Sequence, residues 1–116
     1  MRTYRITGYI ELTIELKNVE GTKTRDVEVD VDSYHIDIYI QPSVLPIEPK
    51  QGPMIFELSF EAEVEALDEG HAEELVTREI KNHIYVSEGE VEDVRVEIEE
   101  IELIDEYSYF PDEEEM

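Results

Sequence analysis

The chain has 116 residues, 41% of them hydrophobic, and a net charge of −23, so it is long enough for one folded domain with a modest core. It contains no cysteine, which excludes a disulfide framework and a cysteine-based metal site. It has no apolar run long enough to cross a membrane and no signal-peptide segment, so we expect a cytoplasmic protein, in its own cell or in an infected host.

Residues 3–17 form the first predicted strand, because apolar and polar residues alternate along them. Gly8 falls in the apolar register, which predicts a bend or bulge at that point. The turn-like segment 18–22 predicts a hairpin with the next strand. The apolar side of the first strand consists of Tyr4, Ile6, Ile10, Leu12, Ile14 and Leu16.

The second predicted strand covers residues 24–31 and has its valines at odd-numbered positions. The apolar residues that follow, from Tyr34 to Ile40, are at even-numbered positions. A shift of one residue turns every side chain to the other face of a sheet. Asp32 and Ser33 are therefore either a bulge or a tight turn into a third strand.

Residues 41–53 hold four of the five prolines, which rules out a helix or a central strand there. We expect a long loop, with Val44, Leu45 and Ile47 as its apolar tips.

Residues 54–66 alternate again, with apolar residues from Phe56 to Ala66 on one side. The opposite side has four carboxylates and no basic residue. Successive residues on one face of a strand are about 6.8 Å apart, so these carboxylates form a regular ladder of negative charge. The ladder consists of Glu57, Glu61, Glu63 and Glu65.

Residues 68–83 change to helical spacing, with Asp68 as the predicted N-cap. A last strand over 91–104 changes phase, which predicts a bulge near Glu99 and Glu100. The fold class is therefore α+β: a mainly antiparallel sheet of about five strands, in the order β-β-β-β-α-β, with one helix on its apolar face. Residues 1–104 form a single domain, and residues 105–116 form a flexible acidic and aromatic tail.

The negative charge is concentrated in the second half of the chain. Residues 54–104 carry seventeen acids and three bases, whereas residues 1–53 carry nine acids and six bases. Regularly spaced carboxylates resemble the regular charge of a nucleic acid, so such a face fits a channel lined by Lys and Arg. An acidic coat that only solubilises the protein, or adapts it to salt or heat, is the alternative explanation. The high Glu content and the few Asn and Gln favour a thermophilic source.

Other residues are expected to extend this partner-binding site. Glu97 and Glu99 would join the ladder if their strand lies beside it, and the helix residues Glu69, Glu73 and Glu74 would adjoin it. The tail would dock through aromatic side chains that occupy the pockets of nucleic-acid bases. These aromatic residues are Tyr107, Tyr109 and Phe110.

Catalytic and metal chemistry find little support in the sequence. It has no cysteine nucleophile and no phosphate-binding loop, so we expect no enzyme and no cofactor. Glu79 and His83 have ligand spacing on the predicted helix, but a third ligand is missing, so no metal site is expected. Direct nucleic-acid binding is disfavoured, because phosphates repel so acidic a chain.

The sequence thus favours a small non-enzymatic interaction protein that binds the basic, nucleic-acid-handling surface of a partner protein. Virus-encoded inhibitors of restriction or CRISPR systems have this profile. One alternative is an accessory subunit of a replication, transcription or ribosomal assembly, docked through its sheet or the 41–53 loop and regulated by its acidic tail. A second alternative is a structural protein that associates with itself through an exposed strand edge.

Overall fold

The computed structural model describes residues 2–16, 25–47 and 52–106. It has one helix, α1, and seven strands in two antiparallel sheets, which confirms the α+β class. The expected single sheet of about five strands is instead divided between two layers. The elements are β1 (Arg2–Leu16), β2 (Arg25–Val31), β3 (Asp37–Gln41), β4 (Val44–Ile47), β5 (Gly52–Ala66), α1 (Glu69–His83), β6 (Ile84–Val86) and β7 (Glu90–Glu106).

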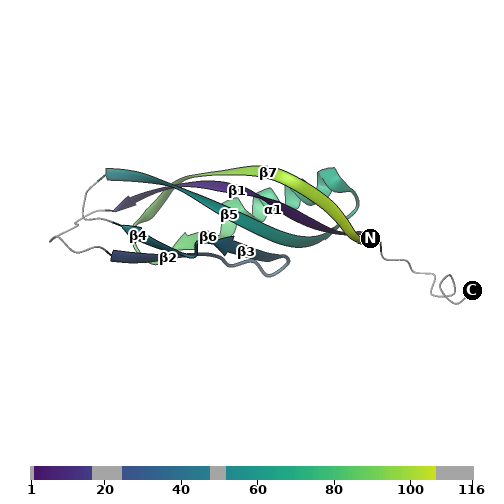
Figure 1. The fold of residues 1–116 in the computed structure, drawn as a ribbon, viewed down its shortest axis with the longest axis horizontal. Helices are drawn as coiled ribbons and strands as arrows, with labels where there is room; N and C mark the ends of the chain where they lie inside the picture. Colours follow the sequence, from purple (N-terminus) through teal and green to yellow (C-terminus); the bar gives the residue numbers. More distant parts are fainter. Residues whose placement is uncertain (1, 17–24, 48–51, 107–116) are drawn as a thin grey trace, which may run out of the picture.

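The larger sheet has four strands in the order β3-β5-β1-β7. Strand β1 is its centre, and it pairs along almost its whole length with β5 on one side and β7 on the other. The smaller sheet has the order β4-β2-β6. Figure 1 shows the three long strands crossing with a strong twist, as adjacent strands do in antiparallel sheets.

The predicted hairpin between the first two strands is wrong. Strand β1 pairs with β5 and β7, whereas β2 pairs with β4 and β6 in the other sheet. Both edges of β1 are thus occupied by long strands from far along the chain. The valines of β2 instead reach the core from the opposite layer, since Val27 and Val29 are buried. The turn proposed over 18–22 lies outside the described residues.

The prediction of a loop over 41–53 is also wrong at both ends and for residues 44–47, because Gln41 ends β3 and Gly52 and Pro53 begin β5. Residues 44–47 form β4, which pairs with β2 on one side only, among the described strands. An edge strand tolerates Pro46 because one of its two edges needs no backbone donor. Leu45 and Ile47, expected as exposed tips, are buried in the core, while Val44 is exposed.

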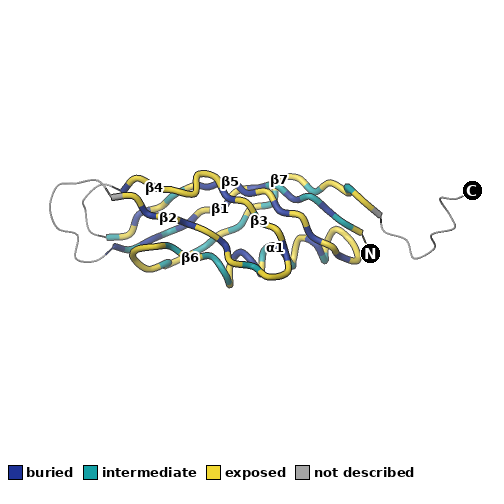
Figure 2. Tube along the Cα trace, turned by 90° about the horizontal axis from the view of Figure 1, so that it is seen from below, coloured by how far each residue is buried: buried dark blue, intermediate teal, exposed yellow. Residues whose placement is uncertain are grey.

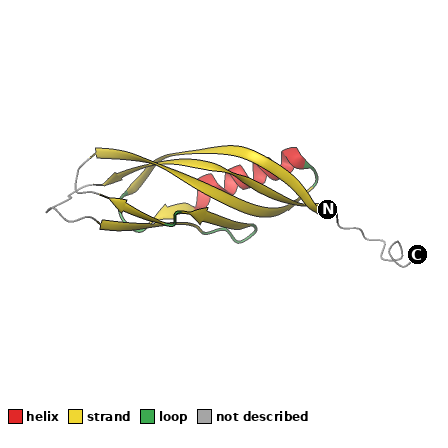
Figure 3. Ribbon diagram, viewed as in Figure 1, coloured by secondary structure: helices red, strands yellow, loops and turns green. Residues whose placement is uncertain are grey.

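One hydrophobic core lies between the layers. The helix α1 covers one part of the larger sheet and the smaller sheet covers the other part (Figures 1 and 3). The buried residues of β1, β2, β5 and α1 belong to one cluster. Figure 2 shows buried residues alternating with exposed ones along these strands. Fully buried side chains include Ile6, Ile10, Leu12, Ile14, Leu58, Val27, Val76 and Ile80.

The helix begins where the sequence predicts. Asp68 is its N-cap, and the Asp68 carboxylate accepts a hydrogen bond of 2.8 Å from the backbone N–H of His71. Its buried face holds Ala72, Val76 and Ile80. No helix among the described residues is both long and apolar enough to span a bilayer.

Residues 32–36 carry the chain from the smaller sheet to β3 at the edge of the larger one. This crossover replaces the bulge or tight turn considered at Asp32 and Ser33. Its anchor is Glu79, a buried residue of α1 whose carboxylate accepts a hydrogen bond of 2.7 Å from the Ser33 hydroxyl. The backbone N–H of Asp32 also donates to the carbonyl of His83. The helix and the crossover are therefore joined by polar contacts as well as by packing.

The predicted bulge at Glu99 and the predicted irregularity at Gly8 are the same feature. Thr7 pairs with Glu100 and Gly8 pairs with Ile98, so Glu99 is the extra residue of β7. A Cβ atom on Gly8 would overlap the carbonyl oxygen of Glu97 and lie 2.9 Å from the Phe60 ring. Only glycine allows the two backbones to come this close. Strand β7 continues to Glu106, two residues beyond the predicted end of the domain.

Candidate functional site: an acidic sheet face

The face of the larger sheet that points away from α1 is exposed and acidic, and we call it the acidic face. Paired residues on neighbouring strands share a face, so the register defines its composition. The four predicted ladder residues of β5 all lie on it. Its carboxylates are Glu57, Glu61, Glu63 and Glu65 of β5, Glu11 and Glu15 of β1, Asp37 of β3, and Glu90, Asp93, Glu97, Glu99, Glu100, Glu102 and Asp105 of β7.

Strand β1 brings the carboxylates of β5 and β7 onto one surface, because it lies between those two strands. Glu97 pairs with Tyr9, and Tyr9 pairs with Ser59 of β5. The sequence-based expectation that Glu97 and Glu99 share the face of the ladder therefore agrees with the register, although one strand intervenes. Glu11 lies directly opposite Glu57, a like-charge pair of the kind that destabilises a sheet.

Arg5 and Arg95 are the arginines that the register places on the acidic face within the described residues. The Arg5 guanidinium is surrounded by three carboxylates from two neighbouring strands. Its Nη1 is 3.2 Å from Glu102 Oε1, its Nη2 is 3.8 Å from Glu63 Oε2, and its Nε is 3.9 Å from Glu61 Oε2. Exposed pairs of this kind contribute about 0–1 kcal/mol each, so Arg5 neutralises part of the face without covering it.

Arg95 binds the acidic face more loosely. Its Nε is 3.3 Å from Asp93 Oδ2, and its Nη1 is 3.9 Å from Glu11 Oε1. In the described part of the chain, no basic side chain lies within 4.0 Å of the carboxylates of Glu57, Glu65 or Glu97. These three carboxylates are therefore available to a basic partner.

The β7 bulge adds one more carboxylate at the middle of the face. The hydroxyl of Tyr9 donates a hydrogen bond of 3.2 Å to Glu99 Oε2, so Glu99 lies on the acidic face beside Glu100. This hydrogen bond, together with the negative charge of Glu99, raises the pKa of Tyr9 above its ordinary value of 10.0. The neutral Tyr9 hydroxyl donates this hydrogen bond, which holds the Tyr9 ring in place beside Glu99.

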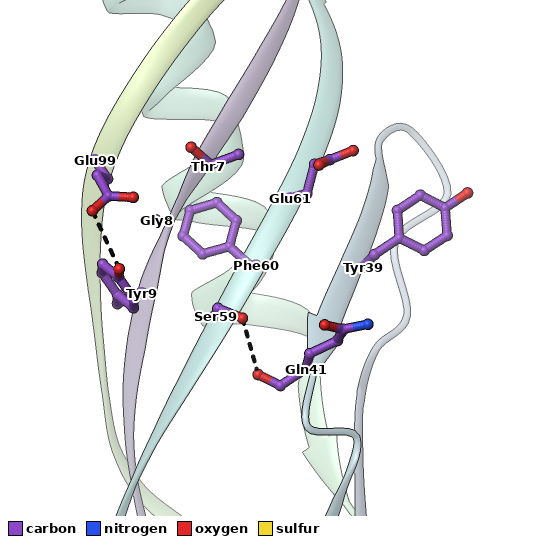
Figure 4. Close-up of a pocket in the computed structure, with 9 residues that line it drawn as sticks. All are labelled: Thr7, Gly8, Tyr9, Tyr39, Gln41, Ser59, Phe60, Glu61 and Glu99. Atoms are coloured by element: carbon purple, nitrogen blue, oxygen red, sulfur yellow. Dashed lines mark hydrogen bonds between the residues drawn. The ribbon is translucent and has the colours of Figure 1, made fainter.

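A hollow of about 480 Å³ lies at the centre of the acidic face, and we call it the central hollow. Its lining includes the short side chains of Thr7 and Ser59, together with Gly8, Phe60 and Gln41. In Figure 4, Tyr9 and Glu99 lie on one side and Tyr39 lies on the other, with Glu61 between them. The Ser59 hydroxyl donates to the carbonyl of Gln41, which ties β5 to the edge strand β3. The lining comes from all four strands of the larger sheet.

The structure separates the three candidate carboxylates of α1 from the acidic face. Glu69, Glu73 and Glu74 are exposed on α1, and α1 packs on the opposite face of the sheet. The expectation that they adjoin the ladder is therefore wrong, because the chain turns under the sheet after β5. Tyr107, Tyr109 and Phe110 lie outside the described residues.

Glu79 and His83, which have the spacing of metal ligands on α1, do not form a metal site with a third ligand among the described residues. His83 Nε2 is 3.8 Å from Glu79 Oε2, and the Glu79 carboxylate is already bound by Ser33. Among the residues that the structure describes, no group of three or more His, Cys, Asp or Glu side chains is placed to hold a metal ion.

The sequence did not predict the residues that form and adjoin the central hollow. The polar register of the first strand contains Tyr9, Arg5 and Thr7, and none of them belongs to the predicted core. Tyr39 falls in the polar register of the third strand in the same way. The period of two was sufficient to place each of them on a solvent face, but the cross-strand pairing that brings them together was needed to find the hollow.

No protein-family model, no curated protein sequence and no solved structure matches the chain. The fold and the site are those of an α+β protein with one acidic, exposed sheet face.

Proposed function

We propose that the protein is a non-enzymatic interaction protein whose acidic face binds the basic, nucleic-acid-handling surface of a partner protein and excludes the nucleic acid. The observation that carries this proposal is the placement of carboxylates from β5, β1 and β7 on one exposed sheet face, with only Arg5 and Arg95 among them in the described residues. A charge distributed evenly for solubility would not need such a face.

The spacing of the face supports the proposal. Successive positions on one face of a strand, such as Glu61, Glu63 and Glu65, are about 6.8 Å apart, and neighbouring strands are about 4.8 Å apart. The result is a two-dimensional array of negative charge on a rigid sheet. A basic cleft that tracks a phosphate backbone presents Lys and Arg side chains at comparable intervals, so it meets several carboxylates at once.

The retained like-charge contact between Glu11 and Glu57 also supports a functional face. Placing two carboxylates directly opposite each other destabilises a sheet, and a basic partner relieves the repulsion. The alternative of an accessory subunit docked through residues 41–53 has less support, because Leu45 and Ile47 are buried in the core. Virus-encoded inhibitors of nucleic-acid enzymes remain the source class that this proposal favours.

The test is an affinity capture from a lysate of the source or host cells at low salt, with a salt gradient and duplex DNA or RNA as competitors. The control bait is the sheet variant Glu57→Gln/Glu65→Gln/Glu97→Gln, which removes three carboxylates that have no basic side chain within 4.0 Å in the described part of the chain. We expect nucleic-acid-binding proteins that are released by salt and by DNA or RNA, and that the control bait does not retain. Partners that bind both baits equally, or that ignore nucleic acid, would contradict the proposal.

A further inference from the structure

The central hollow differs from the rest of the acidic face because it combines carboxylates with aromatic rings. Glu99 stands beside Tyr9 at one side, and Glu61 lies near Tyr39 at the other. Tyr9 is 38% exposed and Tyr39 is 66% exposed, so both rings are accessible to a ligand. A tyrosine face attracts a cation through its π electrons, and an adjacent carboxylate adds a charge-assisted hydrogen bond.

The side chains of the hollow favour a guanidinium over an ammonium ion. Its lining combines the carboxylates of Glu61 and Glu99 with the exposed rings of Tyr9 and Tyr39. A guanidinium is planar, weakly hydrated and able to stack on a ring while it donates to a carboxylate. An ammonium group is compact and strongly hydrated, and gains less from the rings.

The neighbouring row of the same face already holds a guanidinium. Arg5 lies one cross-strand row away, where Glu102, Glu63 and Glu61 surround it at 3.2 to 3.9 Å. Glu61 both contacts Arg5 and lines the hollow. The spacing of carboxylates on these strands is therefore suited to receive an arginine head group from outside as well.

We propose that the central hollow is the binding site for an arginine side chain of the basic partner, stacked against Tyr9 or Tyr39 and paired with Glu99 or Glu61. This inference rests on the proposed function and names the residue that anchors it. A buried arginine with an aromatic neighbour is the kind of contact that dominates the binding energy of an interface. An anionic ligand such as a phosphate is excluded by the carboxylates around the hollow.

The experiment uses two defined probes, a hexa-arginine peptide and a hexalysine peptide, whose side chains carry the same formal charge. Titration calorimetry at low ionic strength measures their affinities for the wild type, for the sheet variant, for Tyr9→Leu, for Tyr39→Leu and for the control Tyr85→Leu. Tyr85 is a half-exposed tyrosine on β6 of the smaller sheet, away from the hollow. Circular dichroism and urea unfolding establish that each variant is folded.

We expect the ratio of arginine to lysine affinity to fall by about two- to fivefold in Tyr9→Leu or Tyr39→Leu, the range of a cation–π contact at an exposed site. Tyr85→Leu should leave the ratio unchanged. An unchanged ratio in both hollow variants would overturn the arginine site, while the acidic face could still bind both peptides. If the sheet variant binds hexalysine as tightly as the wild type does, the proposed function itself fails.

Discussion

Glu11 of β1 and Glu57 of β5 lie directly opposite each other on the acidic face, and Arg95 Nη1 reaches only Glu11, at 3.9 Å. Two carboxylates in this position repel each other, which lowers the free energy of unfolding. This destabilising repulsion lies on the surface where we propose that a basic partner binds.

The first prediction follows from that pair. Glu57→Lys replaces the repulsion with a cross-strand attraction to Glu11, so the free energy of unfolding should rise by about 0.2–1 kcal/mol. Urea unfolding at low ionic strength measures the change. The control is Glu65→Lys, which alters the net charge equally but faces the uncharged Thr3. Equal stabilisation by both variants would show that total charge matters, and not the pair.

The second prediction concerns the close approach of β1 and β7. In Gly8→Ala the added methyl group would overlap the carbonyl oxygen of Glu97 and press on the Phe60 ring. We expect the free energy of unfolding to fall by about 1–3 kcal/mol, the usual effect of overpacking.

A glycine on the helix is the matched control for this change. A Cβ atom on Gly70 would meet only Asp68 Oδ1, at 3.5 Å, which is an ordinary contact. Gly70→Ala should therefore stabilise the protein, by up to about 1 kcal/mol, because alanine is the better helix former. Thermal and urea unfolding of the two variants should shift in opposite directions, and a shared direction would contradict the account of Gly8.

The third prediction tests the anchor between α1 and the crossover to β3. Ser33→Ala leaves the buried Glu79 carboxylate without the hydroxyl that donates to it at 2.7 Å. The free energy of unfolding should fall by about 1–3 kcal/mol, the cost of an unsatisfied buried acceptor. Ser59→Ala, which removes an exposed hydroxyl, should change it by less than about 0.5 kcal/mol. Similar small effects of both substitutions would show that the Ser33–Glu79 hydrogen bond contributes little to the free energy of unfolding.

The fourth prediction is a titration of Tyr9. Its hydrogen bond to Glu99 raises its pKa above 10.0, and Glu99→Gln replaces the charged acceptor of that bond with a neutral amide oxygen. Ultraviolet titration of the wild type and of Tyr9→Phe isolates the Tyr9 signal by difference, and its midpoint should move down in Glu99→Gln.

The sign of the accompanying stability change is fixed by the direction of this shift. The folded state holds the Tyr9 proton more tightly than the unfolded state does, so the contribution to stability is complete below the unfolded pKa of about 10. It is lost as the pH rises through the raised folded value. A Tyr9 midpoint that Glu99→Gln leaves unmoved would contradict the observed hydrogen bond.

The sequence predicted the long strands, the helix and the composition of the ladder, because a period of two or 3.6 residues directly reports which side of an element is buried. The alternation of Glu57 to Glu65 placed four carboxylates on one face, and the phase change at Glu99 located the bulge. Asp68 could be predicted as an N-cap for the same local reason.

The pairing of the strands could not be predicted, because periodicity gives the face of a strand and not its neighbour. The first two strands read as a hairpin, yet β1 takes β5 and β7 as partners and β2 lies in the other sheet. The side of the sheet on which α1 lies decides whether Glu73 and Glu74 join the acidic face, and that side depends on packing. The central hollow requires Tyr9 and Tyr39 to come together from distant segments, which only the tertiary structure supplies.

The most direct test of the account compares two variants that lose the same charge from opposite faces. The sheet variant removes the carboxylates of residues 57, 65 and 97, and the helix variant is Glu69→Gln/Glu73→Gln/Glu74→Gln. Titration calorimetry with the captured partner, at one fixed ionic strength, gives the affinity of each. We expect the sheet variant to bind at least about tenfold more weakly than the wild type, which corresponds to about 1.4 kcal/mol. The helix variant should stay within about twofold of the wild type, since distant charges are screened. Equal losses in the two variants, or a loss only in the helix variant, would contradict the claim that the acidic face is the binding surface.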